Sequence, residues 1–410
     1  MSEIGHDSFT DCPLITSFEL APGNTNFMVE DGILYSYDKS KLIRCPDGKA
    51  GDVTISEGVT EISDNAFFSC DFVTSISIPT GVTTIGQYAF FNCPALKTVT
   101  MPDTVNTISI FAFYMDTALS SMTLSSSLLE ISDSCFAYCS SLTSIAIPSS
   151  VQTIGGGAFA NCTSLADVSI QTDSWLGTIR EGAFISTAIS SFYVPAGLLM
   201  ISQQNVFSQC LSLSSITADT TNPNYFSDNG ILYAKNQPEE GKNEVFICPK
   251  APYGSLSIPS SVMIDMTTYP ITYVGTNAFS ECSKLTDLTL PSSITGIGDG
   301  GLSGLAWITS ITFEDPSTLI TVGDNAFAGD GNITSLQAFT SLTSIGMYAF
   351  TGCRGLLGFY VSSTVTYIGR SAFSYCYTPT IYCQADSQPG TWDADWNIDN
   401  LTVMWSQTLA

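Results

Sequence analysis

The stretch Cys139-Ser-Ser-Leu-Thr-Ser-Ile-Ala-Ile-Pro-Ser-Ser-Val-Gln-Thr-Ile-Gly-Gly-Gly-Ala-Phe159 is one unit of a pattern that recurs along the chain. Its segment Thr-Ser-Ile-Ala-Ile-Pro alternates polar and apolar side chains, which is typical of a half-buried strand. Proline lacks the N–H that would continue a ladder, so it ends the strand. A unit this short cannot bury its own apolar side, and it depends on like units stacked against it.

Phenylalanine marks the period of the repeat. Most steps between the marked residues are 23 residues, two are 25, and one longer break follows Phe207. The marked residues are Phe67, Phe90, Phe113, Phe136, Phe159, Phe184, Phe207, Phe279, Leu302, Phe327, Phe350 and Phe373. Isoleucine or valine usually stands five residues before this position, and cysteine often stands three after it. The period predicts a curved solenoid whose neighbouring strands form a parallel sheet with a spacing of about 4.8 Å.

Two segments interrupt the period and resemble each other. The first runs from Asn24 to Pro46 and the second from Asn222 to Pro249, and both contain Gly-Ile-Leu-Tyr after an Asp or Asn. Asp-Gly and Asn-Gly favour tight turns, so each segment is predicted to be an inserted β-hairpin. The predicted organisation is a first repeat array over 1–218 with an insertion at about 22–48, a hairpin insertion over 219–253, a second array over 254–379 and a capping unit over 380–410.

The chain begins within a repeat. Ile4-Gly-His-Asp-Ser-Phe9 matches Ile85-Gly-Gln-Tyr-Ala-Phe90, and Cys12 stands three residues after Phe9. Either a natural cap or a cut from a longer precursor would explain this start, and we favour the cut because a bare half-repeat exposes apolar surface. The first residues do not resemble a signal peptide, which such a cut would have removed.

The charge balance excludes several classes of function. The chain has 12 Lys+Arg against 37 Asp+Glu, and its formal net charge is −25. Nucleic acids and anionic membrane surfaces both require basic patches, so neither is an expected partner. No stretch reaches the length of a membrane span, and no membrane insertion is expected. The single histidine, His6, excludes catalytic triads with an interior histidine and multi-histidine metal sites.

The thirteen cysteines are predicted to be free and buried. Nine of them occupy one position of the repeat: Cys12, Cys70, Cys93, Cys139, Cys162, Cys210, Cys282, Cys353 and Cys376. Side chains that point in parallel suit disulfide geometry poorly, and zinc sites require closely spaced pairs. The glycines of the repeat turn do not precede the lysine of a phosphate-binding loop, and no pair of acidic residues recurs where the repeat would bring them together. We therefore expect no metal, no cofactor and no catalysis.

The outward face of the strands is the most informative surface. Outward positions are predicted at Glu19, Thr54, Ser77, Thr100, Thr123, Ala146, Ser169, Tyr193, Thr217, Ser257, Thr289, Thr312, Gln337, Tyr360 and Tyr382. Most of these carry hydroxyl groups, and Tyr193, Tyr360 and Tyr382 are the bulky exceptions. Exposed tyrosine is favoured in recognition sites, so these three are the candidate binding residues. The alternative is that tyrosine and threonine are simply good strand residues.

The unit Cys-x-x-Leu-x-x-Ile-x-Ile-Pro-x-x-Val-x-x-Ile-Gly-x-x-Ala-Phe resembles the treponemal-type leucine-rich repeat of BspA-like surface proteins, leucine-rich repeat family 5. The two insertions and the final stretch from Thr380 to Trp396 also resemble segments of that family. The resemblance implies an α/β repeat solenoid: a right-handed leucine-rich-repeat solenoid of about fifteen strands, with a parallel β-sheet on the concave face and short irregular or helical segments on the convex side.

The same resemblance implies a non-catalytic protein at the cell surface or secreted. Its expected function is adhesion to host-matrix or other cell-surface proteins through the solenoid face, and the chain is expected to be a monomer. Two alternatives stay open at this point. One is a glycan-binding accessory protein, and the other is an intracellular or structural scaffold for protein interactions.

Overall fold

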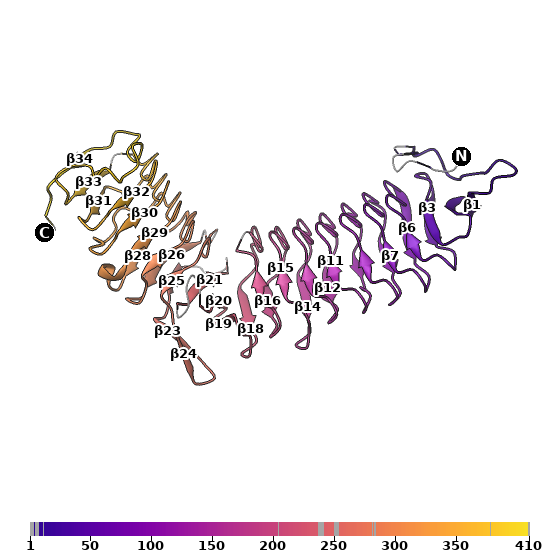
Figure 1. The fold of residues 1–410 in the computed structure, drawn as a ribbon, viewed down its shortest axis with the longest axis horizontal. Coiled ribbons are helices and arrows are strands. Elements are labelled where there is room, and N and C mark those ends of the chain that lie inside the picture. Colours follow the sequence, from indigo (N-terminus) through magenta and orange to yellow (C-terminus); the bar gives the residue numbers. More distant parts are fainter. Residues whose placement is uncertain are drawn as a thin grey trace. The chain divides into compact units, whose positions relative to one another are not determined.

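The computed structural model describes residues 4, 8–10, 12–203, 205–236, 242–249, 254–280, 282, 284–377 and 379–408. His6 lies outside the described residues. The chain divides into two compact units, Met1–Ser212 and Leu213–Ala410. Figure 1 shows that each unit is a succession of similar coils. Within the described part of the chain, the only helix is a single 3-10 turn, η1 (Pro316–Thr318).

Each coil of the first unit contributes strands to two rows, which we call the broad row and the narrow row. The first three strands of the unit form an antiparallel meander and precede both rows: β1 (Phe27–Glu30), β2 (Ile33–Ser36) and β3 (Lys41–Arg44). The broad row is β4 (Ala50–Thr54), β6 (Phe72–Ser77), β8 (Thr98–Thr100), β10 (Ser121–Met122), β12 (Ser144–Ile147), β14 (Asp167–Ile170) and β16 (Ser191–Val194). The narrow row is β5 (Glu61–Ile62), β7 (Thr84–Ile85), β9 (Thr107–Ile108), β11 (Glu130–Ile131), β13 (Thr153–Ile154), β15 (Thr178–Ile179) and β17 (Met200–Ile201).

The second unit has the same plan. It begins with β18 (Ser215–Ala218) and a meander of β19 (Tyr225–Asp228), β20 (Ile231–Ala234) and β21 (Glu244–Ile247). Its broad row is β22 (Gly254–Ser257), β26 (Leu285–Leu290), β28 (Ser310–Phe313), β31 (Gly358–Val361), β33 (Thr380–Cys383) and β34 (Val403–Met404). Its narrow row is β25 (Tyr273–Val274), β27 (Gly296–Ile297), β29 (Thr321–Val322), β30 (Ser344–Ile345) and β32 (Tyr367–Ile368).

The pairing between coils is parallel and keeps equivalent residues in register. In the broad row Ile145 of β12 pairs with Val168 of β14, and in the narrow row Ile154 of β13 pairs with Ile179 of β15. The predicted repeat solenoid with parallel strands is therefore confirmed. Both predicted insertions are antiparallel, and each has a third strand that continues into the narrow row. That strand is β3, which pairs with β5, in the first unit and β21, which pairs with β25, in the second.

A third hairpin was not predicted from the sequence. Strands β23 (Ser261–Ile264) and β24 (Thr267–Pro270) pair antiparallel and project from the coils of the second unit (Figure 1). The turn between them consists of Asp265 and Met266, both with left-handed backbone, at φ +45° and +64°. Two-residue hairpin turns of this kind usually use Asn-Gly or Asp-Gly. The sequence lacks that signal here, which is why the turn was missed.

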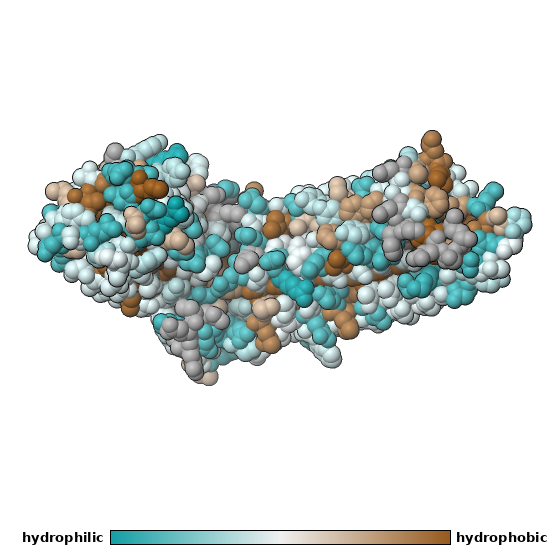
Figure 2. Space-filling view, turned by 45° about the horizontal axis from the view of Figure 1, so that its top comes forward, coloured by the Kyte–Doolittle hydropathy of each residue, from teal (hydrophilic) through white to brown (hydrophobic). Residues whose placement is uncertain are grey.

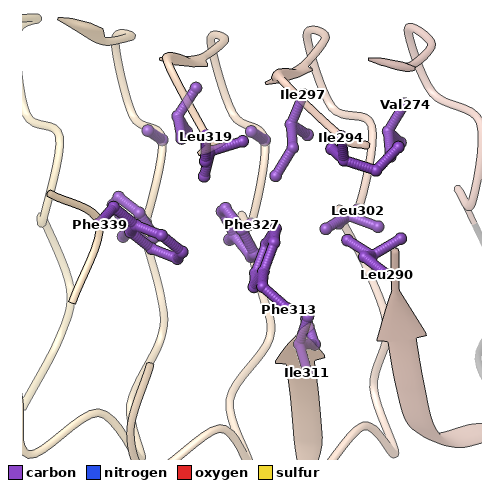
Figure 3. Close-up of a cluster of buried hydrophobic side chains, with 14 of the residues drawn as sticks. Val274, Leu290, Ile294, Ile297, Leu302, Ile311, Phe313, Leu319, Phe327 and Phe339 are labelled. Atoms are coloured by element: carbon purple, nitrogen blue, oxygen red, sulfur yellow. The ribbon is translucent and has the colours of Figure 1, made fainter. Parts of the chain in front are cut away.

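The repeat phenylalanines form stacks along the core of each unit. Ring centroids from Phe67 through Phe207 follow one another at 4.9 to 5.8 Å. In the second unit Phe327, Phe350 and Phe373 stack at 5.0 and 5.1 Å, and the buried Trp396 closes the stack edge-on at 6.2 Å. Figure 3 shows how side chains from successive coils meet in this interior, with Leu302 standing in the phenylalanine position.

The cysteines form a buried column, as the spacing predicted. None of the thirteen cysteines forms a disulfide, and every one except Cys12 is buried. The Cys162 thiol donates to the carbonyl of Phe136 in the preceding coil at 3.0 Å, and the Cys376 thiol donates to Phe350 in the same way at 3.2 Å. The thiol is thus a small core side chain that also satisfies one backbone carbonyl per coil.

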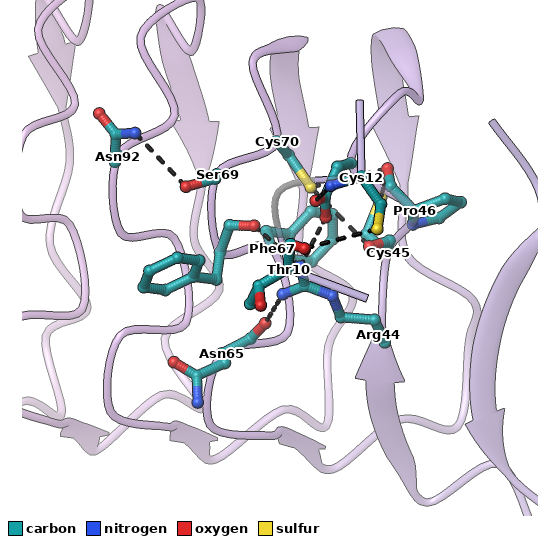
Figure 4. A network of polar contacts seen from close by, with 12 residues as sticks. Thr10, Cys12, Arg44, Cys45, Pro46, Asn65, Phe67, Ser69, Cys70 and Asn92 are labelled. Carbon is teal, nitrogen blue, oxygen red and sulfur yellow. Dashed lines mark hydrogen bonds and ion pairs between the residues drawn. The ribbon is translucent and has the colours of Figure 1, made fainter. Parts of the chain in front are cut away.

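A buried ion pair joins the first insertion to the coils that follow it. Arg44 contacts the Asp47 carboxylate, and both side chains are almost completely buried. Its guanidinium also donates to the backbone carbonyls of Asn65 and Phe68, while Asp47 accepts from the N–H of Cys12 at 2.9 Å. Figure 4 shows Arg44 reaching Asn65 beside the column of Cys45 and Cys70. This network gives partners to the Asp47 carboxylate and to the two terminal nitrogens of the Arg44 guanidinium, which would otherwise be costly to bury.

Candidate functional site

The predicted outward residues do face solvent. All fifteen positions listed from the sequence are exposed or half-buried. Three of them, Glu19, Thr123 and Gln337, lie outside the strands that the structure defines. Gln337 compensates for the missing strand with its side chain, because its Oε1 accepts from the N–H of Phe313 at 2.7 Å and its Nε2 donates to the Phe313 carbonyl at 3.0 Å. The side-chain amide thus makes the pair of hydrogen bonds that the backbone of a neighbouring strand would otherwise make.

The structure brings two of the three candidate tyrosines together. Tyr360 of β31 and Tyr382 of β33 are register partners on adjacent parallel strands. Tyr382 is in turn paired with Met404 of β34. Tyr193 lies on β16 in the first unit, where it is half-buried. The candidate site is therefore Tyr360, Tyr382 and Met404, which we call the tyrosine patch.

The tyrosine patch has a fixed geometry. A side chain at Gly358 would place its Cβ 3.1 Å from Cε2 of Tyr382, so the Tyr382 ring packs closely over this glycine and would have to shift to admit a larger residue. The hydroxyl of Tyr360 donates to the carbonyl of Gln407 at 3.3 Å. Tyr382 and Met404 remain 38% and 44% exposed. One tyrosine is thus anchored at its hydroxyl, while the other two side chains present apolar surface to solvent.

No charged residue belongs to the three strands that carry the patch, whose sequences are Gly-Phe-Tyr-Val, Thr-Ile-Tyr-Cys and Val-Met. The neighbouring Leu357 is 75% exposed. An uncharged surface of aromatic and aliphatic groups has the composition found at the core of protein interfaces. Figure 2 shows hydrophobic residues gathered in separate patches on a surface that is otherwise hydrophilic or neutral.

Sequence reasoning missed Met404. The alternation in Thr402-Val-Met404 is a short strand signal, but it follows a long loop and does not keep the period of the repeat. The register of Tyr382 with Met404 shows that the chain returns to the broad row after that loop. The strand was therefore recognisable in the sequence, but only the pairing shows that it lies beside β33.

Acidic side chains near the carboxyl end accept hydrogen bonds from backbone groups. Asp399 accepts from the N–H of Tyr375 at 2.7 Å, and Asp393 accepts from the N–H of Asp395 at 2.8 Å. Across the part of the chain that the structure describes, no group of three or more His, Cys, Asp or Glu side chains could hold a metal ion. The described residues also include no helix that is long and apolar enough to span a membrane.

The model of the BspA type leucine rich repeat region matches the chain in six copies, over residues 47–155, 129–232 and 256–380. These stretches together cover well over half of the sequence. No curated protein matches the chain.

Several solved structures share the fold. A leucine-rich cell surface protein of Faecalibacterium prausnitzii is 24% identical, with a TM-score of 0.65 over 96% of this chain and 100% of that one. The pneumococcal vaccine antigen PcpA is 16% identical, with a TM-score of 0.67 over 94% of this chain and 99% of that one. A leucine-rich repeat protein of Bacteroides ovatus is 22% identical, with a TM-score of 0.59 over 95% and 99%.

Proposed function

Because the chain belongs to the family of BspA-type leucine-rich repeat proteins, we propose that it is a non-catalytic binding protein of the cell surface or secreted space, and that the tyrosine patch contacts a protein ligand. Repeat solenoids present extended surfaces on which partner proteins bind. The Faecalibacterium protein with the same fold is described as a cell surface protein, which supports the location. Adhesion to host-matrix or other cell-surface proteins is the function that fits these features best.

The observation that carries the proposal is the pairing of Tyr360 with Tyr382 and of Tyr382 with Met404 on three adjacent strands. Single exposed tyrosines need no explanation on a strand, since tyrosine is a good strand residue. A tyrosine pair that continues into an exposed methionine on uncharged strands is a contiguous surface of the kind that supplies most binding energy in protein interfaces.

The test is a binding screen of the purified chain against immobilised fibronectin, fibrinogen, laminin and collagen, with a glycan array in parallel. Tyr382→Ala and Met404→Ala are the test variants, because neither side chain is buried. Tyr193→Ala is the matched control, since Tyr193 stands at the same position of the repeat in the other unit. Saturable binding that weakens about tenfold or more in the test variants, but not in the control, supports the proposal.

Two results would count against the tyrosine patch. Binding to matrix proteins that is unchanged in both test variants would place the contact elsewhere on the chain. Binding to glycans alone would replace the protein ligand with the glycan-binding alternative.

A further inference from the structure

Aromatic side chains crowd one corner of the coils in the first unit. They occupy the positions one or two residues from the core phenylalanine of four successive coils. We call this group the aromatic ledge: Phe68, Tyr88, Phe91, Phe111, Tyr114 and Tyr138. Tyr138 is exposed and the others are half-buried, so the ledge belongs to the surface, unlike the buried stack of Phe67, Phe90, Phe113 and Phe136.

The rings of the ledge pack in two columns. In one column Phe68, Phe91 and Tyr114 stack at centroid distances of 4.9 and 5.2 Å, with planes within 5° of parallel. In the other column Tyr88 stacks on Phe111 at 5.1 Å and 10°. The columns touch edge to face, as in Tyr88 with Phe91 at 5.4 Å and 78°. This is an ordered surface rather than a scatter of exposed rings.

The fold does not require these aromatic residues. The next three coils carry Ala160, Ile185 and Ser208 directly after the core phenylalanine, and Gly157, Gly182 and Asn205 two residues before it. Coils with and without the ledge make the same backbone contact, because the N–H of the core phenylalanine donates to the alanine carbonyl of the next coil at 2.8 Å both for Phe90, within the ledge, and for Phe159, beyond it. The ledge is therefore additional to the repeat.

The ledge also carries a backbone cost. Tyr88 and Phe111 have left-handed backbone, with φ of +56° and +58°. Other coils place Asn65, Asn277 or Gly157 at this position, which are residues that tolerate the left-handed region. A bulky aromatic residue there is an outlier, and strain that the fold does not need is characteristic of functional sites.

The geometry and the charge together define what the ledge can bind. Stacked rings cover one another's faces and expose edges, so the ledge offers little open ring face on which a sugar could lie. From Glu57 to Asp133 the chain has eight acidic residues, of which Asp116 is buried, and a single basic one, Lys97. Asp64 stands directly before the left-handed position in the first coil of the ledge and is exposed, whereas Asp133, at the same position in the last coil, pairs with Arg180 at 3.3 Å. Charge complementarity therefore favours a cationic partner with apolar contact groups.

We propose that the aromatic ledge is a second binding surface, separate from the tyrosine patch, and that it binds a polypeptide segment which combines apolar side chains with lysine or arginine. The apolar groups contact the ring edges, and the cations contact the flanking carboxylates. The anionic chain disfavours nucleic acid and anionic lipid at the same place.

The test uses a phage-displayed library of random peptides, selected on the immobilised full chain and counter-selected on a Tyr88→Asn/Phe111→Asn variant. This variant introduces asparagine, which other coils have at the same left-handed position, as in Asn65 and Asn277. It therefore retains the fold while it removes the column of Tyr88 and Phe111. A second variant, Phe91→Ala/Tyr114→Ala, introduces the alanine that later coils have at the equivalent positions, Ala137 and Ala160. It removes two rings of the other column. Tyr348→Asn is the matched control, since Tyr348 has the same left-handed position at φ +55° in the second unit.

The expected result is enrichment of peptides that contain both apolar and basic residues. Synthetic copies of these peptides should bind about tenfold or more weakly to each ledge variant, and equally to the Tyr348→Asn and Tyr382→Ala variants. Binding should weaken as salt is raised, because the cationic contacts are exposed. The proposal is overturned if selection enriches acidic peptides, if the enriched peptides bind the ledge variants equally well, or if a glycan array identifies ligands that the ledge variants lose.

Discussion

The carboxyl Oδ1 of Asp116 accepts a hydrogen bond from the backbone N–H of Cys93, one coil earlier, at 2.7 Å. Asp116 stands where neighbouring coils carry the buried cysteine, and it is completely buried. Asp330 repeats the arrangement in the second unit, where it accepts from the N–H of Leu305 at 2.9 Å. Among the described residues, neither Oδ2 atom has a hydrogen-bond partner. Burial raises the pKa of both carboxyl groups well above the ordinary range.

The raised pKa of Asp116 makes the stability of the protein depend on pH. The folded state holds the proton while the unfolded state releases it near pH 4, so the free energy of unfolding falls as pH rises above about 4 and stops falling at the folded-state pKa. Replacing Asp116 by Cys, the residue of the repeat, should raise the free energy of unfolding at pH 7 by about 1–3 kcal/mol. Urea unfolding at several pH values between 4 and 8 would measure this.

The Asp116→Cys variant should also have a free energy of unfolding that depends less on pH between pH 4 and 7. Asp103→Ser is the control, because Asp103 is exposed and its hydrogen bonds with Ser126 lower the pKa of its carboxyl group instead of raising it. An Asp116→Cys protein that loses stability with pH as steeply as the parent chain would show that Asp116 is not the group responsible.

Thiol reactivity should separate Cys12 from the column of buried cysteines. Cys12 is half-buried, whereas burial raises the pKa of the Cys93 and Cys139 thiols well above the usual range and that of Cys376 to about 11. Because the thiolate is the reactive form, these buried thiols should be inert at pH 8. Iodoacetamide followed by mass spectrometry should label Cys12 in the native chain and the column only after unfolding. Rapid labelling of Cys93 in the native chain would contradict the buried column.

Breaking the ion pair in the first insertion should be strongly destabilising. Asp47→Ala leaves the Arg44 guanidinium buried with no carboxylate, and loss of one partner of a buried pair costs about 3–5 kcal/mol. The double variant Arg44→Met/Asp47→Ala should recover most of that loss, because the uncompensated charge is gone. Chemical denaturation of both variants would measure the difference. Equal losses in the two would mean that the cost lies in packing rather than in charge.

The tip of the third hairpin should be improved by glycine. Met266 has a φ of +64° and is 95% exposed, so its side chain contributes strain without packing. Met266→Gly should stabilise the hairpin, because it removes about 1–2 kcal/mol of left-handed strain and adds only about 0.4–1 kcal/mol of conformational entropy to the unfolded chain. Hydrogen exchange of the amides in β23 and β24 would detect slower local opening. Met263→Gly, in the middle of β23, is the control and should speed exchange instead.

Much of the interior could be predicted from the sequence because the repeat leaves few alternatives. A step of 23 residues places Phe90 over Phe67 and Cys93 over Cys70, so the period alone predicts both columns. The thiols were also predicted to be free, since parallel side chains suit disulfides poorly. The third hairpin was missed because Asp265-Met266 lacks the glycine that marks such a turn.

The surface was harder to predict than the core. Spacing alone indicated that Tyr360 and Tyr382 fall in successive coils, but not that Met404 extends the row, since the last strand follows a loop that breaks the period. The aromatic ledge is visible in the sequence as aromatic residues beside Phe90 and Phe113. However, the pattern does not say whether those rings are buried, exposed or in contact.

The sequence by itself determined the coil, its period and the identity of the residues that stack, because translation along a solenoid repeats every neighbour relationship. Only the tertiary structure decided what departs from that repeat: the return of β34 to the broad row, the projection of β23 and β24, and the two ring columns that begin with Phe68 and Tyr88. The physical reason is that a repeat fixes contacts between equivalent positions. Contacts between different positions depend on backbone angles and side-chain directions within each coil, which the period does not constrain.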